Sequence, residues 1–292
     1  MRKNNLWNTL QTIGILSKIK VVIMMLFAAL TGMLIAPKNA QNPLTMSIGL
    51  LGIALHAISS ATLNQLFETD IDQRMQRTQS RPLPTQSISN QKAVIMALGS
   101  FTLGSLVLWV GTTSTATYLS MLTTLGYAVI YTRILKPITS QNIVIGGLSG
   151  AMPPLLGWAC LQPTIQVEPI VLVLIIFAWT PAHFWPLAIH NIKDYQRASL
   201  PMLPVTHGVN FTTYSIMAYT LLTSSVSLLP YCIGLCSYYY LIVACTLNAR
   251  FIYMAYQLHK TKSKPITVFT YSILYLYCLF MAIICDHTLG LL

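Results

Sequence analysis

The chain has 292 residues and a formal net charge of +11, yet only 8% of its residues are charged. Hydrophobic residues make up 54% of it and the mean hydropathy is +0.63, whereas in soluble proteins roughly a quarter of residues are charged. This composition excludes a soluble globular protein and indicates a polytopic membrane protein. Loops beside anionic lipid account for the basic charge, so we expect membrane lipid and no nucleic acid as a partner.

Long apolar runs recur along the whole chain. A helix needs about 20 apolar residues to cross a hydrocarbon core of roughly 30 Å. By this criterion we expect about nine transmembrane helices, at roughly 19–36, 44–67, 93–110, 116–134, 143–161, 169–190, 213–234, 237–257 and 266–285. These runs leave no room for a soluble domain. Residues 1–292 are therefore predicted to form a single all-α integral-membrane domain.

The distribution of basic residues indicates the orientation. If the N-terminus is cytoplasmic, nine spans place every one of the 17 lysines and arginines except Lys38 on the cytoplasmic side. This asymmetry satisfies the positive-inside rule. We expect a protein of the cytoplasmic (inner) membrane with its N-terminus in the cytoplasm and its C-terminus outside.

The stretch NQLFETDIDQRMQRTQSRPLP, residues 64–84, follows the second apolar run and concentrates acidic residues in a chain that has only six. Asn64, Glu68 and Asp72 are spaced i, i+4, i+8, so on a helix they share one face over about 12 Å. The same face extends back to Ser60 and His56, whereas Asp70 points elsewhere.

Oxygen ligands stacked in this way suit Mg²⁺, which binds few protein carboxylates and completes its shell with water and phosphate oxygens. Arg77 and Arg81 follow and can hold the same phosphates bidentately. A solvated helix end with ordinary ion pairs fits the spacing equally well, so the segment alone does not decide between the two interpretations.

A second acidic helix end occurs in WTPAHFWPLAIHNIKDYQRASLPMLPVTHG, residues 179–208. Here Asp194 is flanked by Lys193 and Arg197, and on a regular helix His183 and His190 share its face. Four predicted spans separate the two segments, so both lie on the same side of the membrane. Two such ends facing one central cavity, open to the cytoplasmic side, favour a metal–diphosphate site over a solvated helix end.

These segments resemble the UbiA-like intramembrane prenyltransferase superfamily, and within it the branch that modifies heme. The matching stretches cover nearly the whole chain: Asn64-x-x-x-Glu68-x-x-x-Asp72, Arg77-Thr78-x-x-Arg81-Pro82, Tyr131–Trp158, WTPAHFW and KDYQRASLPMLPV. The first is typical of the superfamily, and the last three are more specific to the heme branch.

The resemblance implies transfer of a farnesyl group from farnesyl diphosphate to a vinyl group of heme b, giving heme O and diphosphate. It implies that Mg²⁺ is held by Asn64, Glu68, Asp72 and, at a second site, Asp194. It also implies phosphate contacts from Arg77, Arg81, Lys136, Lys193 and Arg197. The candidate protein partners are a heme A synthase or a terminal-oxidase assembly.

Two positions depart from the superfamily pattern. Glu68 stands where many relatives have aspartate, which keeps the charge and lengthens the reach. His190 occupies the first position of a pair that is aspartate in the wider superfamily, which argues against a symmetric two-metal site.

The histidines within or at the ends of apolar runs are candidate heme contacts. Intramembrane ionisable residues are often functional, and imidazole ligates heme iron. His183, His56 and His190 are therefore candidates for binding iron or a propionate. The alternative for His183 and His56 is a neutral ring hydrogen-bonded between helices.

Two rival functions fit the same composition. A prenyltransferase acting on an aromatic quinone precursor would share the first motif but not the heme-branch segments. A transporter would use the acids as an ion path. Because the acids gather at one membrane interface beside basic residues, the prenyltransferase interpretation is favoured.

Overall fold

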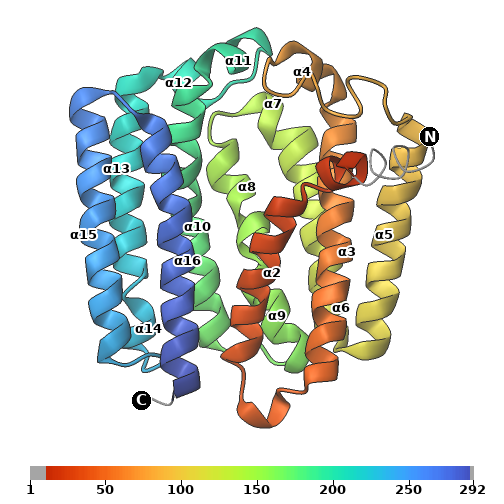
Figure 1. Ribbon diagram of the computed structural model, residues 1–292, viewed down its shortest axis with the longest axis vertical. Coiled ribbons are helices and arrows are strands. Elements are labelled where there is room, and N and C mark those ends of the chain that lie inside the picture. The colour runs from red at the N-terminus through yellow and green to blue at the C-terminus, as the bar shows by residue number, and fades with distance from the viewer. Residues whose placement is uncertain (1–10, 290–292) are drawn as a thin grey trace.

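The computed structural model describes residues 11–289, and all of the regular secondary structure in that range is helical. The long helices run side by side along one direction (Figure 1). Six helical segments of the described chain are long and apolar enough to cross a membrane. They are α3 (Pro43–Phe67), α5 (Asn90–Gly111), α8 with α9 (Asn142–Leu161), α10 (Val167–His190), α15 (Tyr238–Thr261) and α16 (Pro265–Leu289).

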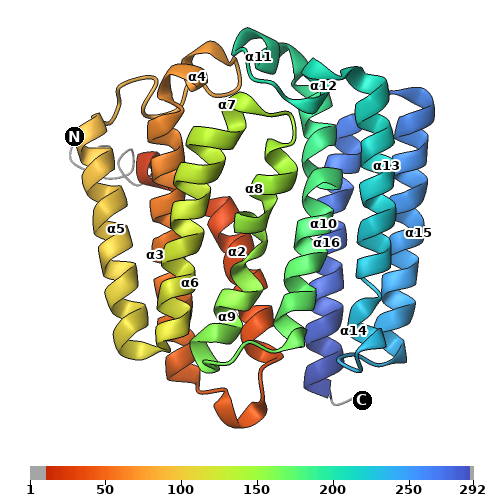
Figure 2. The ribbon, with the colours of Figure 1, turned by 180° about the vertical axis from the view of Figure 1, so that it is seen from behind.

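Three more helical segments run alongside these six (Figures 1 and 2). They are α2 (Ile19–Leu34), α6 (Ser114–Leu125) continued by the π-helical η2 (Gly126–Leu135), and α13 (Gly208–Val226). The predicted run 213–234 was misplaced, because α13 begins at Gly208 and has ended before the separate short helix α14 (Leu229–Cys232). Proline at the second position of α14, Pro230, is typical of a helix start.

The predicted run 143–161 is two helices rather than one. Helix α8 (Asn142–Ala151) ends before Met152, and α9 begins at Pro153. Consecutive prolines at 153 and 154 have no amide hydrogen to donate, so the hydrogen-bond ladder is interrupted there. The break turns α9 toward α2, where the backbones touch: a Cβ added at Gly157 would lie 1.9 Å from the carbonyl oxygen of Ala29.

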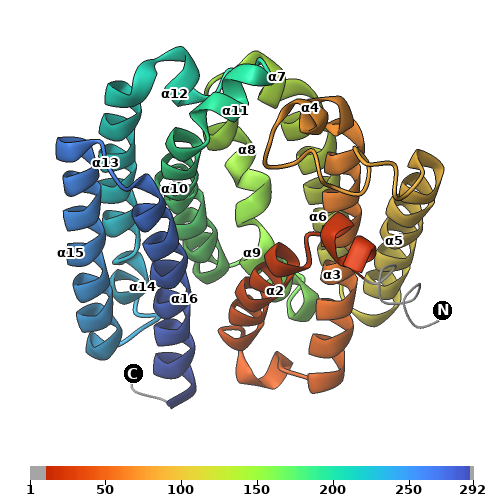
Figure 3. The same ribbon diagram turned by 45° about the horizontal axis from the view of Figure 1, so that its top comes forward.

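Both acidic segments lie at the same end of the bundle, as the sequence predicted. The short helices α4 (Thr69–Arg74), α7 (Lys136–Ile138), α11 (Ile192–Arg197) and α12 (Leu203–Thr206) gather there (Figures 1 and 3). The 3-10 turn η1 (Lys38–Ala40) lies at the opposite end. It contains Lys38, the one basic residue that the predicted topology places outside the cytoplasm.

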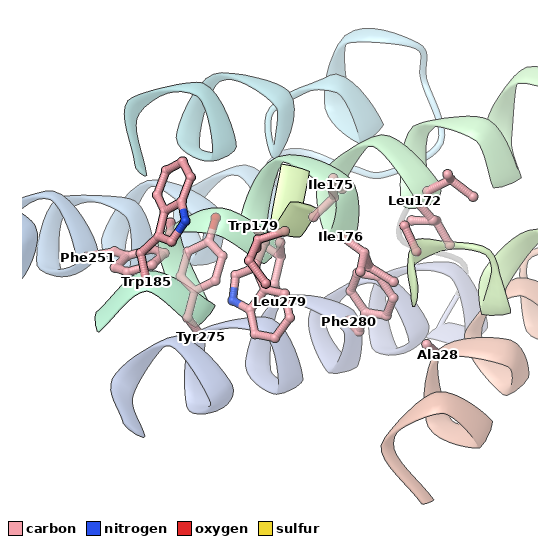
Figure 4. Close-up of a cluster of buried hydrophobic side chains, with 14 of the residues drawn as sticks. Ala28, Leu172, Ile175, Ile176, Trp179, Trp185, Phe251, Tyr275, Leu279 and Phe280 are labelled. Carbon is pink, nitrogen blue, oxygen red and sulfur yellow. The ribbon is translucent and has the colours of Figure 1, made fainter. Parts of the chain in front are cut away.

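The largest buried apolar cluster fixes α10, the helix that leads into α11. Trp179 and Ile176 of α10 pack with Leu279 and Phe280 of α16, and Phe251 of α15 belongs to the same cluster (Figure 4). Within a membrane, such helices associate through van der Waals packing of their side chains rather than through transfer of apolar surface out of water. The position of the second acidic segment is thus set by a well-packed core.

Candidate active site

The first acidic segment keeps its three oxygen-bearing side chains on one face although the helix is interrupted. Helix α3 ends at Phe67, and Glu68 has φ −102° and ψ 9°. The i→i+4 pattern nevertheless continues, because Glu68 N donates to Asn64 O at 3.1 Å and Asp72 N donates to Glu68 O at 2.7 Å. Asn64, Glu68 and Asp72 are all buried, whereas Asp70 is exposed, as predicted.

Each carboxylate of this face is paired with a cation from another part of the chain. Lys136 Nζ lies 2.5 Å from Glu68 Oε1, and Arg81 Nη1 lies 2.7 Å from Asp72 Oδ2. Lys136 is the first residue of α7, so the end of η2 delivers it to the site. Buried charges are costly unless paired and hydrogen-bonded. These two ion pairs therefore hold the carboxylates in place.

Asn64 links the face to a third cation that the sequence did not single out. Its Oδ1 accepts a hydrogen bond from Lys18 Nζ at 2.6 Å, and its Nδ2 donates to Glu68 Oε1 and to Thr132 Oγ1. Lys18 precedes α2 and has left-handed backbone angles, φ 50° and ψ 48°. The chain thereby turns at Lys18 and directs its amine toward the carboxylates.

The charges at this site favour an anionic ligand. Burial alone would raise the pKa of Glu68, but the cations Lys136 and Lys18 lower it overall. Burial lowers the pKa of Lys18 to about 8, although the Glu68 carboxylate favours its charged form. Burial opposes ionisation of Lys136 too, but contact with Glu68 raises its pKa. Two carboxylates thus share the site with three cations when Arg81 is included.

Asp194, the acidic residue of the second segment, connects that segment to the loop after α4. Its carboxylate accepts hydrogen bonds from Gln76 N at 3.4 Å and Arg77 N at 3.2 Å, and it is ion-paired with Arg197. The side chain is buried within α11. Lys193 is exposed and takes part in no ion pair within the described range 11–289.

The expectation that His183, His190 and Asp194 share one helical face is wrong. Helix α10 ends at His190, and Asn191, with φ −102° and ψ 24°, separates it from α11. His190 is consequently exposed while Asp194 is buried. The regular-helix assumption failed because the turn that begins α11 interrupts α10 just before Asp194.

Comparisons with known proteins show the family of the chain. The profile of the UbiA prenyltransferase family matches residues 25–284. The chain is 46% identical to protoheme IX farnesyltransferase 1 of Pseudomonas putida, with 94% of this chain and 93% of the relative covered. It is 44% identical to protoheme IX farnesyltransferase 1 of Vibrio parahaemolyticus, with 94% and 92% covered.

The chain belongs to the UbiA prenyltransferase family. It is therefore an integral membrane prenyltransferase. Two solved structures share its fold. One, from work on digeranylgeranylglyceryl phosphate synthase, has a TM-score of 0.79 and 19% identity, and the match covers 96% of this chain and 99% of that one. The other, a UbiA homolog from Archaeoglobus fulgidus bound to GPP and Mg²⁺, has a TM-score of 0.67 and 16% identity, and the match covers 93% of this chain and 99% of that one.

The donor set of this UbiA prenyltransferase is compatible with a magnesium ion. Asn64, Glu68 and Asp72 offer amide and carboxylate oxygens on one face, which are the hard ligands that Mg²⁺ prefers. Within residues 11–289, no three His, Cys, Asp or Glu side chains converge as a metal cage. An ion here would thus take few protein ligands and leave positions for phosphate oxygens, which is how Mg²⁺ is usually bound beside a phosphate substrate.

The two deep histidines make contacts between helices. His183 Nδ1 lies 2.7 Å from Ser272 Oγ, and the ring is stacked between Trp179 and Phe269, with centroids at 4.1 and 4.5 Å. These contacts favour the packing interpretation of this ring.

His56 is engaged on both sides of its ring. Its Nδ1 lies 3.0 Å from Thr124 Oγ1, and its Nε2 lies 3.3 Å from Ser105 Oγ. Its two nitrogens thus bridge α3 to α6 and α5, which again favours packing.

Replacing His183 with alanine is expected to lower the free energy of unfolding by about 1–3 kcal/mol, because the hydrogen bond of the ring to Ser272 and its stacking on Trp179 and Phe269 are lost. The heme b titration of the variant should match the wild type. Melting curves and Soret titrations of the two proteins check this, and a weakened titration with an unchanged melting temperature would instead assign the ring to heme.

Proposed function

We propose that this UbiA prenyltransferase transfers the farnesyl group of farnesyl diphosphate to a vinyl group of heme b, forming heme O. The observation that carries the proposal is the buried face of Asn64, Glu68 and Asp72, surrounded by Lys18, Lys136 and Arg81. Relatives 44–46% identical to the chain are named protoheme IX farnesyltransferases, which supports heme as the acceptor.

The leaving diphosphate is held by the cations at this end of the bundle. Lys136 and Arg81 already lie against the carboxylates, and the remaining proposed phosphate contacts are Arg77, Lys193 and Arg197. Mg²⁺ held by Asn64, Glu68 and Asp72 would neutralise part of the diphosphate charge. A solved UbiA homolog bound to both GPP and Mg²⁺ supports this proposal. We propose Asp194 as the ligand of a second ion, in addition to its contact with the first loop.

The chemistry follows from the charge of the leaving group. As the C1–O bond of farnesyl diphosphate breaks, the electron pair leaves with the diphosphate and C1 gains allylic carbocation character. Fixed cations that stabilise the departing charge lower this barrier. A vinyl carbon of heme then attacks C1, and water adds to the resulting cation, releasing a proton and leaving a hydroxyl group. Because a vinyl group is a weak nucleophile, water has to be kept away from C1 until the carbon–carbon bond forms.

The proposed setting is the cytoplasmic membrane, with residues 1–292 as one domain. We propose nine spans around a central cavity that opens to the cytoplasm, an N-terminus on that side and a C-terminus outside. Residues 290–292 lie outside the described range. A heme A synthase or a terminal-oxidase assembly is the proposed recipient of the product.

The orientation predicts the labelling of two exposed positions. Ser263 and Thr288 lie before and near the end of α16, the last described helix. With the native cysteines replaced, a cysteine at 263 should react with a membrane-impermeant thiol reagent only from the cytoplasmic side, and one at 288 only from outside. Labelling of both from one side would contradict the proposed topology.

The reaction itself is tested by incubating purified protein with farnesyl diphosphate, heme b and Mg²⁺ and measuring released diphosphate. Release that requires heme b and is abolished by EDTA is expected. Release at an unchanged rate in EDTA would contradict the metal assignment, and absence of release with heme b present would contradict the proposed function.

A further inference from the structure

A pocket of about 280 Å³ lies at the end of the bundle opposite the acidic segments. Four segments that are distant in the sequence line it: residues 35–38, which follow α2, the start of α10, residues 233–235 between α14 and α15, and the end of α16. In Figure 1, η1, α14 and the end of α16 all lie at the lower end of the molecule. The pocket therefore joins the N-terminal and C-terminal parts of the bundle.

Two opposite charges line this pocket without pairing with each other. Lys38 belongs to η1, and Glu168 belongs to the first turn of α10. Among residues 11–289, no ion pair includes either of them. Glu168 Oε2 is buried and has no hydrogen-bond partner among these residues. The dipole of α10 favours an acid at this position, but it leaves the oxygen without the donor that a buried acceptor requires.

A second buried atom at this pocket lacks a partner. His287 of α16 lines the pocket, and its Nδ1 is buried without a hydrogen bond in the described part of the chain. The neighbouring Asp286, by contrast, is engaged, because its carboxylate accepts from the amides of Ser237 and Tyr240. These bonds fix the end of α16 against the start of α15. The pocket thus offers an amine, a carboxylate and a ring nitrogen, each from a different segment.

The pocket lies where lipid headgroups are expected, at the ends of membrane-spanning helices. Helix α10 begins at Val167, and α16 ends at Leu289. Ile233, which lines the pocket, is 38% exposed. Ile170, four residues after the lining residue Gln166, is 42% exposed. Exposed apolar side chains of an integral membrane protein contact lipid, so acyl chains can run from the pocket along α10.

We propose that this pocket binds the headgroup of phosphatidylethanolamine. The headgroup carries one phosphate and one primary ammonium, which complement Lys38 and Glu168. The ammonium supplies the donor that Glu168 Oε2 lacks, while Lys38 and His287, with its proton on Nδ1, donate to the phosphate. A lipid bound in this way connects four segments and stabilises the contact between the two parts of the bundle. Because the pocket is at the other end of the bundle from the acidic face, its ligand is independent of the chemistry proposed there.

Lipids that differ only in the number of N–H groups test the proposal on the wild-type protein. Protein purified in detergent and freed of lipid is titrated with phosphatidylethanolamine, its N-methyl and N,N-dimethyl derivatives and phosphatidylcholine, all with the same acyl chains. Native mass spectrometry gives the Kd of the tightest-bound lipid. The affinity should fall along the series, by at least about 10-fold from the first lipid to the last, since charge-assisted hydrogen bonds are lost. Equal affinities along the series would overturn the proposal.

Two variants and their matched controls assign the binding to this pocket. Glu168→Gln should bring the affinities for phosphatidylethanolamine and phosphatidylcholine together, because a neutral amide is a weaker acceptor for an ammonium than a carboxylate. Lys38→Gln should weaken both lipids alike, because both carry the phosphate. Asp70→Asn and Lys92→Gln, exposed positions at the acidic end, should keep the wild-type affinities. A Glu168→Gln variant with the wild-type preference would overturn the site.

Soluble phosphoethanolamine separates a lipid from a water-soluble ligand of the same chemistry. It lacks the acyl chains that lie along α10, so at a concentration equal to that of the lipid it should not displace phosphatidylethanolamine from the wild-type protein. Displacement under these conditions would overturn the assignment of the pocket to a lipid.

Discussion

Replacing Asp72 with asparagine is expected to reduce prenyl transfer by at least about 100-fold, since the substitution removes a charge from the centre of the site and keeps the shape. Asp72 is only 2% exposed and is ion-paired with Arg81. The charge-neutral amide should bind Mg²⁺ poorly. The turnover of the variant, measured as released diphosphate at saturating Mg²⁺, checks the prediction.

The matched control is Asp70→Asn, which removes an acid two residues away on the exposed side of the same helix. Its turnover should remain near that of the wild type. Turnover of Asp72→Asn within a few-fold of the wild type, with melting curves that show a folded protein, would contradict the role of this carboxylate.

The second large effect is expected on stability, at the pair of Lys136 and Glu68. Replacing Lys136 with methionine leaves a buried carboxylate without its closest cation, and breaking such a pair costs about 3–5 kcal/mol. The double variant Lys136→Met/Glu68→Gln should regain most of this loss, because the side chain left without its cation is then neutral. Both variants should be nearly inactive in prenyl transfer. The single variant lacks a proposed diphosphate contact, and the double variant lacks a proposed metal ligand as well.

Thermal melting in detergent of the single variant, the double variant and the control Lys260→Met separates the two roles. Lys260 is exposed on α15, so its replacement should have little effect on the melting temperature. A single variant as stable as this control would contradict the proposed pairing, and a fully active double variant would contradict the catalytic assignment.

The sequence predicted the first acidic face correctly because its determinant is local. Asn64, Glu68 and Asp72 stay aligned through backbone hydrogen bonds between residues four apart, which survive the end of α3 at Phe67. The placement of both acidic segments at one end was also predictable, since it follows from hydropathy and from the number of spans between them.

The contacts that complete the site could not be predicted, because they depend on packing between distant segments. Lys18 reaches Asn64 across 46 positions, and only after a left-handed turn that a lysine rarely adopts. The carboxylate of Asp194 accepts from the amides of Gln76 and Arg77, more than 100 positions earlier in the chain. Neither spacing nor composition carries a signal for such pairings.

The most direct test of the central claim is a competition between acceptors. Purified protein receives farnesyl diphosphate and Mg²⁺ together with equal amounts of heme b and an aromatic quinone precursor, and the farnesylated product is identified by mass spectrometry. Heme b carrying a hydroxyethylfarnesyl group, with the aromatic compound unmodified, is the predicted result. A farnesylated aromatic compound with unmodified heme b would contradict it.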